Sequence, residues 1–268
     1  MDGLMKGKRG LIMGVANKNS IAWGIATTLA EHGAELAFTY QGDAFGKRVK
    51  PLAESVGSDM QLSCDVEDIA SVDALFEKLE KEWGEIDFIV HAIGFSDREE
   101  LKGKYADTSR ENFSRTMVIS CFSFTEIARR AAKLMKNGGS MLTLTYGGST
   151  RVMPNYNVMG VAKAALEASV RYLANDFGPD NIRVNAISAG TVRTLAGAGI
   201  ADARQMYNYQ HNNAPLRRTV SLEELGGSAL YLLSDLSGGV TGEVHFVDTG
   251  YNIVSMPSLE QLAKLDGE

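Results

Sequence analysis

The sequence predicts a doubly wound α/β fold: a parallel sheet of seven strands with helices on both faces. Short apolar runs alternate six times with segments of helix length. Several of these runs are apolar throughout, as is typical of parallel strands that are covered on both faces. The chain of 268 residues is 44% hydrophobic and 22% charged, which is enough for one large core. We therefore expect a single domain over residues 1–268.

The predicted elements follow in order along the chain. The strand candidates are rich in Val, Ile, Phe and Thr, and cover residues 9–15, 34–40, 60–64, 86–94, 140–146, 182–188 and 243–247. The helix candidates cover residues 20–32, 44–56, 68–83, 109–136, 155–177 and 221–236. The stretch 189–220 contains no clear strand. Insertions of this length in a compact domain are usually binding loops or lids, so we expect such a loop at about 190–220.

Composition excludes several classes of function. A net charge of −6 and a pI near 5.4 argue against nucleic acid or an anionic membrane as a partner. No apolar run reaches 18 residues, and the N-terminal one is broken by Gly14, so we expect neither a membrane span nor a signal peptide. Cys64 and Cys121 lack metal-binding or redox spacing. These features predict a soluble cytoplasmic protein without a metal site.

The first strand and helix offer a phosphate site. In an open α/β sheet, ligands bind at the carboxyl ends of the strands, where a helix N-terminus presents free N–H groups. In the stretch GVANKNSIAWGIA, Gly14 permits a tight turn, while Ser20 and Ile21 open the helix. Gly14 and Gly24 do not form the usual GxGxxG motif, so an ordinary turn remains an alternative. The position in the first of six repeating units favours nucleotide binding.

The end of the second strand favours NADH over NADPH. The sequence there, YQGD, has no Arg to hold a 2′-phosphate. Gln41 can hydrogen-bond ribose hydroxyls, and Asp43 would repel a phosphate. Lys47 and Arg48 lie one turn further into the next helix and leave NADPH open.

The next two strand ends complete the predicted nucleotide site. Asp65 and Val66 follow the third strand, where they can meet the adenine. The alternative for Asp65 is a helix cap. Ile93 and Gly94 end the fourth strand, where a small residue lets the backbone approach the cofactor.

The fifth strand and its following helix carry the candidate chemistry. The strand ends at Tyr146, before two glycines, and the predicted helix 155–177 contains Tyr156 and Lys163. Seven residues at about 100° each fall about 20° short of two turns, so both side chains share one helix face, roughly 10 Å apart. A helical Lys is more often a surface charge and a Tyr more often packing. Their position after the fifth strand favours a role in the site.

Several segments together resemble a known enzyme family. GVANKNSIAWGIA, YQGDA, HAIGF, TLTYGG, PNYNVMGVAK and NAISAGTVRTLA resemble the bacterial enoyl-acyl-carrier-protein reductases of type II fatty-acid synthesis. These are divergent short-chain dehydrogenases with a Rossmann-type fold, and the similarity runs from about residue 4 to 256. Most short-chain dehydrogenases place the Tyr four residues before the Lys, where this chain has Met159. The longer Tyr-to-Lys spacing and the SAG-x-x-RTLA segment are the specific part of the resemblance.

The resemblance implies an activity and residue roles. The enzyme would reduce the C2=C3 bond of trans-2-enoyl-acyl-carrier-protein with NADH, the last step of the elongation cycle. Tyr156 would hydrogen-bond the thioester carbonyl, Lys163 would hold the nicotinamide ribose, Tyr146 would line the acyl pocket and Ser96 would contact substrate. The family's cofactor positions match Gly14, Ser20, Ile21, Gln41, Asp65, Val66, Ile93, Val192, Arg193, Thr194, Leu195 and Ala196.

The same resemblance implies a homotetramer assembled through the helices at 109–136 and 155–177. The apolar residues on these helices fit an ordinary core equally well. They are Phe122, Ile127, Leu134, Leu166, Val170 and Leu173.

The chemistry explains the altered spacing. A ketone reductase protonates an alkoxide on the carbon that receives the hydride. In an enoyl thioester, hydride goes to C3 while charge develops on the thioester oxygen, two carbons away. A donor displaced along the pocket suits that charge. A 3-ketoacyl reductase is therefore disfavoured, whereas a regulatory protein that only senses dinucleotide remains an alternative.

Two departures from the family concern residues 194–213, which resemble its substrate-binding loop. Relatives often have Pro at the position of Thr191, so we expect a looser loop entrance here. They also often carry several basic residues for carrier docking near 201–205, where this chain has only Arg204. Docking is then weaker or uses another residue, such as Arg151.

Overall fold

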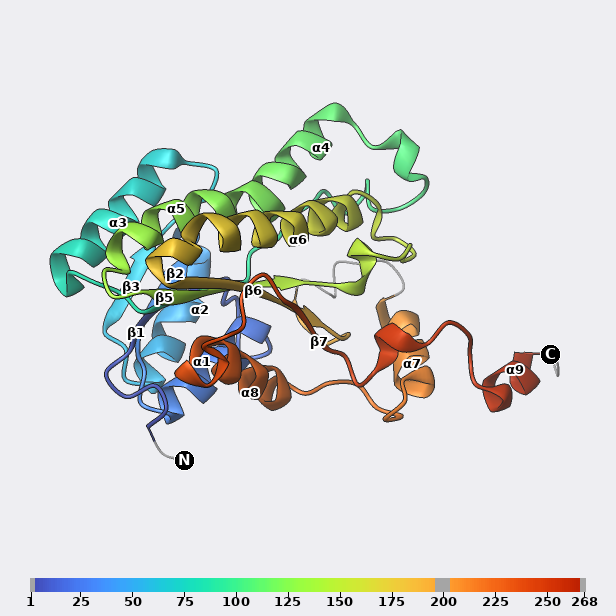
Figure 1. Ribbon diagram of the computed structural model, residues 1–268. Helices are drawn as coiled ribbons and strands as arrows, with labels where there is room; N and C mark the ends of the chain where they lie inside the picture. The colour runs from blue at the N-terminus through green and yellow to red at the C-terminus, as the bar shows by residue number, and fades with distance from the viewer. Residues whose placement is uncertain (1–2, 196–202, 266–268) are drawn as a thin grey trace.

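The seven predicted strands are all confirmed, and they form one parallel sheet in the order β3-β2-β1-β4-β5-β6-β7 (Figure 1). The computed structural model describes residues 3–195 and 203–265. Its strands are β1 (Arg9–Met13), β2 (Glu35–Tyr40), β3 (Met60–Ser63), β4 (Phe88–His91), β5 (Gly139–Thr145), β6 (Ile182–Ala189) and β7 (Val244–Val247). The strand order reverses between β1 and β4. Ligands of such sheets bind at this reversal, outside the carboxyl ends of the strands.

The six predicted helices are also confirmed, with one of them divided. The helices are α1 (Ile21–Glu31), α2 (Gly42–Ser55), α3 (Ile69–Trp83), α4 (Arg110–Met117), α5 (Ser123–Leu134), α6 (Asn157–Phe177), α7 (Ala203–Asn213), α8 (Leu222–Leu233) and α9 (Leu259–Leu265). A π-helical segment, Val118–Phe122, separates α4 from α5 inside the predicted helix 109–136. Helices α7 and α9 were not predicted from the sequence. The α7 sequence is mostly polar and lacks a clear apolar period.

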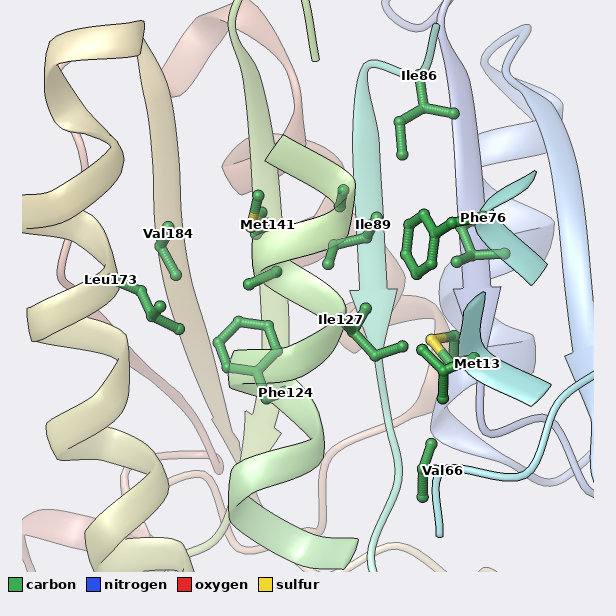
Figure 2. Packing of buried hydrophobic residues seen from close by; sticks show 14 of the residues in the cluster. Met13, Val66, Phe76, Ile86, Ile89, Phe124, Ile127, Met141, Leu173 and Val184 are labelled. Atoms are coloured by element: carbon green, nitrogen blue, oxygen red, sulfur yellow. The ribbon is translucent and has the colours of Figure 1, made fainter. Parts of the chain in front are cut away.

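Each face of the sheet has its own core. Helices α3, α5 and α6 cover one face, and α1, α2 and α8 cover the other (Figure 1). On the first face, Phe124 and Leu173 reach from the helices toward Met141 and Val184 on the strands (Figure 2). Of the apolar residues considered for a tetramer interface, five lie in this core: Ile127, Leu134, Leu166, Val170 and Leu173. Ordinary core is thus the correct interpretation for these five.

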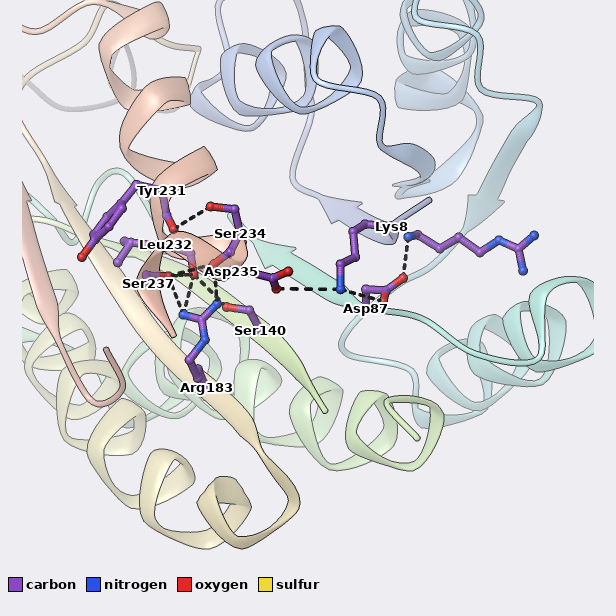
Figure 3. A network of polar contacts seen from close by, with 10 residues as sticks. Lys8, Asp87, Ser140, Arg183, Tyr231, Leu232, Ser234, Asp235 and Ser237 are labelled. Atoms are coloured by element: carbon purple, nitrogen blue, oxygen red, sulfur yellow. Dashed lines mark hydrogen bonds and ion pairs between the residues drawn. The ribbon is translucent and has the colours of Figure 1, made fainter. Parts of the chain in front are cut away.

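The amino ends of the strands are tied together by a polar network (Figure 3). The Arg183 guanidinium donates to the Leu232 carbonyl at 2.8 Å and to the Ser234 carbonyl at 3.1 Å, near the end of α8. Lys8 lies 3.6 Å from the Asp87 carboxylate. These contacts satisfy helix-end carbonyls and anchor α8 to the sheet. The opposite, carboxyl edge of the sheet carries the residues predicted to be functional. No helix among the described residues is long and apolar enough to cross a membrane.

Candidate active site

The turn after β1 is shaped for a close approach of backbone segments. Gly14 has φ +100°, and a Cβ there would lie 2.1 Å from the Ala92 carbonyl oxygen, so only glycine fits. The buried Ser20 hydroxyl accepts hydrogen bonds from the Ala16 and Asn17 amides at 3.0 and 3.2 Å. Ser20 thus holds the loop, and the first N–H groups of α1, beginning at Ile21, remain for a phosphate.

The ends of β2 and β3 are joined by side chains. The Gln41 amide donates to the Asp65 carboxylate at 2.9 Å, and that carboxylate also accepts from the Glu67 amide at 2.9 Å. The cap of α3 is Asp68, which accepts from the Ala70 amide. The alternative role of Asp65 as the helix cap is therefore wrong.

The residues beyond β4 face the middle of α6. A Cβ on Gly94 would lie 3.6 Å from Met159 Cε and 3.8 Å from Lys163 Nζ. Gly94 therefore lies close to the Lys163 ammonium, next to Ile93 and on the same edge as the β1 turn. Val66, from the end of β3, is buried nearby in the first core.

Ser120, which no sequence pattern indicated, lies beside Gly94 at the end of β4. It lies in the π-helical segment, accepts from the Phe95 amide at 2.8 Å and donates to the Phe95 carbonyl at 2.9 Å. The adjacent Ser96 is buried and hydrogen-bonded to Asn112 and Thr116. A π insertion leaves no signal in a 3.6-residue pattern, although such insertions often occur at functional sites.

Tyr156 lies just before α6, which corrects the prediction that it is part of that helix. Asn155 and Asn157, on either side of it, have φ of 56° and 35°. Asn tolerates this left-handed region better than most residues, so the pair turns the chain before the helix starts. The regular helical geometry that predicted a shared face with Lys163 therefore does not apply at Tyr156.

Tyr156 is enclosed by residues from three segments. Its side chain is 7% exposed, and its ring packs edge-on against Tyr146 with centroids 5.1 Å apart. Leu101, in the loop after β4, belongs to the same buried cluster as Tyr156. The Asn157 amide holds that loop, donating to the carbonyls of Leu101 at 3.0 Å and Gly103 at 3.3 Å.

Burial controls the ionisation of both tyrosines. Burial, with lesser contributions from Tyr146 and Glu167, raises the pKa of Tyr156 well above its ordinary value. Burial also raises the pKa of Tyr146. Both phenols are therefore neutral and able to donate a hydrogen bond throughout the physiological pH range.

Lys163 is a buried cation at the end of β5. It is 7% exposed, and its Nζ donates to the Leu144 carbonyl at 2.9 Å. Burial lowers the pKa of Lys163 to about 8, and the nearby Cys121 and Glu167 partly oppose that shift. Glu167, one helical turn along α6, is itself buried and accepts from the Thr145 hydroxyl at 2.6 Å. This arrangement can present a positive charge to a sugar hydroxyl.

The segment after β6 leads to α7. Arg193 lies with its guanidinium 4.3 Å from the Tyr207 ring on α7, and the Thr194 amide donates to the Val192 carbonyl at 2.9 Å. Leu195 is exposed. Ala196, the last predicted cofactor residue, lies outside the described residues, as do Gly197, Ala198 and Gly199.

The entrance to this segment is tethered rather than loose. The Thr191 amide donates to the Gln210 side-chain oxygen at 2.8 Å, a bond that Pro could not make. The expectation of a looser entrance at Thr191 stays a prediction, which the hydrogen bonds from Thr191 to Gln210 oppose.

The parallel sheet, the glycine turn beside α1 and the buried Tyr and Lys define a class of protein. They describe a dinucleotide-dependent reductase of the short-chain dehydrogenase type. The family model described as Enoyl-(Acyl carrier protein) reductase matches residues 14–252. The chain belongs to this family, which confirms the predicted resemblance.

Individual relatives are similar over nearly their whole length. An enoyl-[acyl-carrier-protein] reductase [NADH] of Rhizobium meliloti is 74% identical over 268 residues, 100% of both chains. The crystal structure of FabI from Candidatus Liberibacter asiaticus is 63% identical, with a TM-score of 0.94 over 96% of this chain and 100% of that one. The reductase of Anaplasma phagocytophilum, solved with NAD, is 57% identical, with a TM-score of 0.94 over 97% and 99%.

Proposed function

We propose that this chain reduces the C2=C3 double bond of trans-2-enoyl thioesters on acyl carrier protein, the last step of each fatty-acid elongation cycle. The observation that carries the proposal is the buried, neutral Tyr156 packed against Tyr146, on the same sheet edge as the buried Lys163. Relatives named as enoyl-acyl-carrier-protein reductases support the substrate.

NADH is the cofactor, as predicted. The similar enzymes are named as NADH reductases, and one was solved with NAD. The residues present fit a dinucleotide: Gly14 leaves no room for a side chain, and Gln41 and Asp65 place an amide and a carboxylate where ribose hydroxyls can bond. When bound, NADH supplies the hydride that C3 of the substrate receives.

Tyr156 is proposed to stabilise the charge that develops on the thioester oxygen. Its phenol is neutral and shielded from water, so a hydrogen bond from it to an oxyanion is stronger than it would be in solvent. Tyr146 packs edge-on against the ring, and the backbone at Gly148 lies against it too, since a Cβ there would be 2.4 Å from Tyr156 Cδ1.

Lys163 is proposed to hold the nicotinamide ribose. Its ammonium is anchored to the Leu144 carbonyl and lies close to Gly94, at the end of β4. An ammonium has three donors, so two remain for sugar hydroxyls. The remaining cofactor contacts are proposed for the predicted residues that follow the ends of β1, β2, β3, β4 and β6.

A 3-ketoacyl reductase is the competing function within the fold. Such an enzyme needs a donor beside the carbon that receives hydride, and Met159, four residues before Lys163, has none. NADH oxidation, followed by absorbance, should occur with a trans-2-enoyl thioester and not with a 3-ketoacyl thioester. Turnover of the second substrate alone would establish the competing function, and turnover of neither would favour a dinucleotide sensor.

We also propose that residues 190–220 form the substrate-binding segment and that Arg204 contributes to carrier docking. Arg204 is exposed on α7. Arg151 is also exposed, but its guanidinium donates to the carbonyls of Asn252 and Val254, which makes it less available. Arg204→Glu should raise the KM for an acyl-carrier substrate and leave the KM for an acyl-coenzyme A substrate unchanged. An unchanged KM for both would remove Arg204 from docking.

We also propose that the protein is a homotetramer and that it lies in the cytoplasm. Exposed apolar residues on α4, α6 and the π-helical segment support assembly through these helices: Phe113, Val118, Phe122, Val161 and Tyr172. Both cysteines are free and buried, which suits a reducing compartment. Light scattering of the purified protein tests the mass, and a monomer would refute this assembly.

A further inference from the structure

Glu167 is a buried carboxylate that the proposed mechanism does not use. It lies on α6, four residues after Lys163, and is 8% exposed. Residues four apart are neighbours on one face of a helix, so the two charged side chains leave α6 on the same side. Burying a carboxylate costs free energy unless hydrogen bonds or an opposite charge compensate for it. The groups that compensate for the burial of Glu167 are the Thr145 hydroxyl and the Lys163 ammonium.

Lys163 and Glu167 contact consecutive residues at the end of β5. Lys163 Nζ donates to the Leu144 carbonyl at 2.9 Å, and the Thr145 hydroxyl donates to Glu167 Oε1 at 2.6 Å. The second bond is short, as is typical of a hydroxyl that donates to a carboxylate. The strand ends at Thr145, and Tyr146 follows it directly. The two bonds therefore fix the backbone that precedes Tyr146 against α6.

The Glu167 carboxylate also affects the charge of Lys163. Burial lowers the pKa of Lys163 to about 8, while Cys121 and Glu167 oppose this shift. His91, on β4, is the other ionisable group that interacts with Lys163 among the described residues. Burial raises the pKa of Cys121 and lowers the pKa of His91 to about 3, so neither changes its charge near pH 8. Glu167 thus supplies the negative charge that favours the charged form of Lys163.

We propose that Glu167 is a positioning residue with two effects: through Thr145 it sets the place of Tyr146, and through its charge it holds Lys163 in the ammonium form that binds the cofactor. This inference rests on the proposed function. Glu167→Gln keeps the first effect and removes the second, because the amide oxygen still accepts from Thr145 but carries no charge. Thr145→Val removes the hydrogen bond and keeps the charge. The two effects can therefore be measured separately.

The pH dependence of NADH affinity, measured by fluorescence, tests the effect of the charge. In Glu167→Gln the affinity should fall at a pH about 1 pH unit below that of the wild type, because the opposite charge beside Lys163 is gone. At pH 6 the ammonium is mostly charged in both proteins, so their affinities should agree within about 2-fold. Asp176→Asn removes a carboxylate from an exposed position of the same helix and should keep the wild-type profile.

A purely structural role for Glu167 would give a different result. The affinity of Glu167→Gln would then be lower by the same factor at pH 6 and pH 8, and this outcome would overturn the inference. A profile of Glu167→Gln that matches Asp176→Asn would overturn it as well. In the Lys163→Met background, Glu167→Gln should change NADH affinity by less than about 2-fold at any pH, because the charge that it supports is absent.

The kcat for a trans-2-enoyl thioester at pH 6 tests the hydrogen bond to Thr145. Thr145→Val keeps nearly the same shape, and losing one buried hydrogen bond predicts a kcat lower by about 3–10-fold. Thr145→Ser restores the hydroxyl and should recover most of kcat. Glu167→Gln keeps an acceptor, so its kcat should stay within about 2-fold of the wild type. A Thr145→Val variant as active as the wild type, or a Thr145→Ser variant as slow as Thr145→Val, would contradict the positioning of Tyr146.

Failure of this inference differs from failure of the proposed function. NADH binding does not require turnover, so the pH profile of Glu167→Gln tests the charge effect whatever the substrate is. A wild-type protein that binds NADH but does not reduce the enoyl thioester would refute the proposed function, and with it the role of Thr145 in placing Tyr146.

Discussion

The proposed dinucleotide half and the proposed acyl half of the site are built in different ways. In the dinucleotide half, residues at the strand ends and first helix turns lie where any doubly wound sheet would put them, as at Gly14 and Ser20. In the acyl half, Tyr156 depends on two left-handed asparagines and on a loop that Asn157 anchors more than 50 residues away. The positions of the residues in the first half follow from the topology of the sheet. Those in the second half follow from individual side-chain contacts.

This difference predicts separable effects of mutation. Changes in the acyl half should alter turnover while leaving dinucleotide affinity intact. Lys163 is the exception, because it lies on α6 but faces the cofactor side at Gly94.

Tyr156→Phe should produce the largest effect. Removing one hydrogen-bond donor to a developing oxyanion typically lowers kcat by about 10²–10³-fold. The phenyl ring keeps the packing against Tyr146, so NADH affinity should stay nearly unchanged. Stopped-flow or steady-state kinetics and NADH fluorescence titration give both values. A comparable loss of NADH affinity would show that the two halves are not separable at this residue.

Lys163→Met should come next, with NADH affinity weaker by about 10–100-fold at pH 7, the range for a charged hydrogen bond. Because burial lowers the pKa of Lys163 to about 8, the ammonium is charged below that pH and neutral above it. The NADH affinity of the wild type should therefore fall as the pH rises through about 8.

The pH profile of NADH affinity in the Lys163→Met variant is the control for this prediction. Cys121, Glu167 and His91 lie near this group, but burial raises the pKa of Cys121 and lowers the pKa of His91 to about 3, so neither changes its charge in this range. The variant should therefore show a flat profile. A wild-type profile that is flat from pH 7 to 9 would remove the Lys163 charge from cofactor binding.

The same contrast explains what the sequence could predict. The strands and their parallel arrangement follow from apolar runs and their positions, so Gly94 and Gln41 could be placed at strand ends without a structure. Ser120, Gln210 and the backbone at Tyr156 could not, because a π insertion, a polar helix and two left-handed residues leave no periodic signal. The Tyr-to-Lys spacing indicated the correct family, although its helical explanation fails at Tyr156.

Asn157→Ala should have an intermediate effect on the acyl half. It removes two hydrogen bonds to the loop at Leu101 and Gly103 and places Ala at φ 35°. We expect a loss of about 1–3 kcal/mol in the free energy of unfolding and a lower kcat/KM. Asn157→Gly also removes the side-chain amide, but glycine adopts the left-handed backbone angle without strain. The difference in the free energy of unfolding between the two variants therefore measures the backbone strain at position 157. If Asn157→Gly matches the wild type in kcat/KM, the loop bonds do not support Tyr156.

Arg115 spans the boundary between the halves, and its replacement should have the smallest effect. Its guanidinium makes two 2.8 Å hydrogen bonds to Glu67, next to the residues predicted to meet the adenine, and stacks 4.5 Å from the Phe95 ring, beside Ser96. The pair is solvent-exposed, so Arg115→Met should lower the free energy of unfolding by less than about 1 kcal/mol, and by less still at high salt.

The Arg115 variants also test whether cofactor binding in one half of the site affects substrate binding in the other. Arg115→Lys keeps the charge but loses the planar, two-bond geometry, so an effect that appears in both variants must come from stacking and geometry. The exposed Lys78–Glu82 pair on α3, which makes no contact between the halves, provides the comparison for salt dependence. If Arg115→Lys changed NADH affinity and the KM for enoyl substrate together, the two halves would communicate through this contact. We expect neither to change more than about 2-fold, because a surface ion pair carries too little free energy to link two sites that the sheet already holds in place.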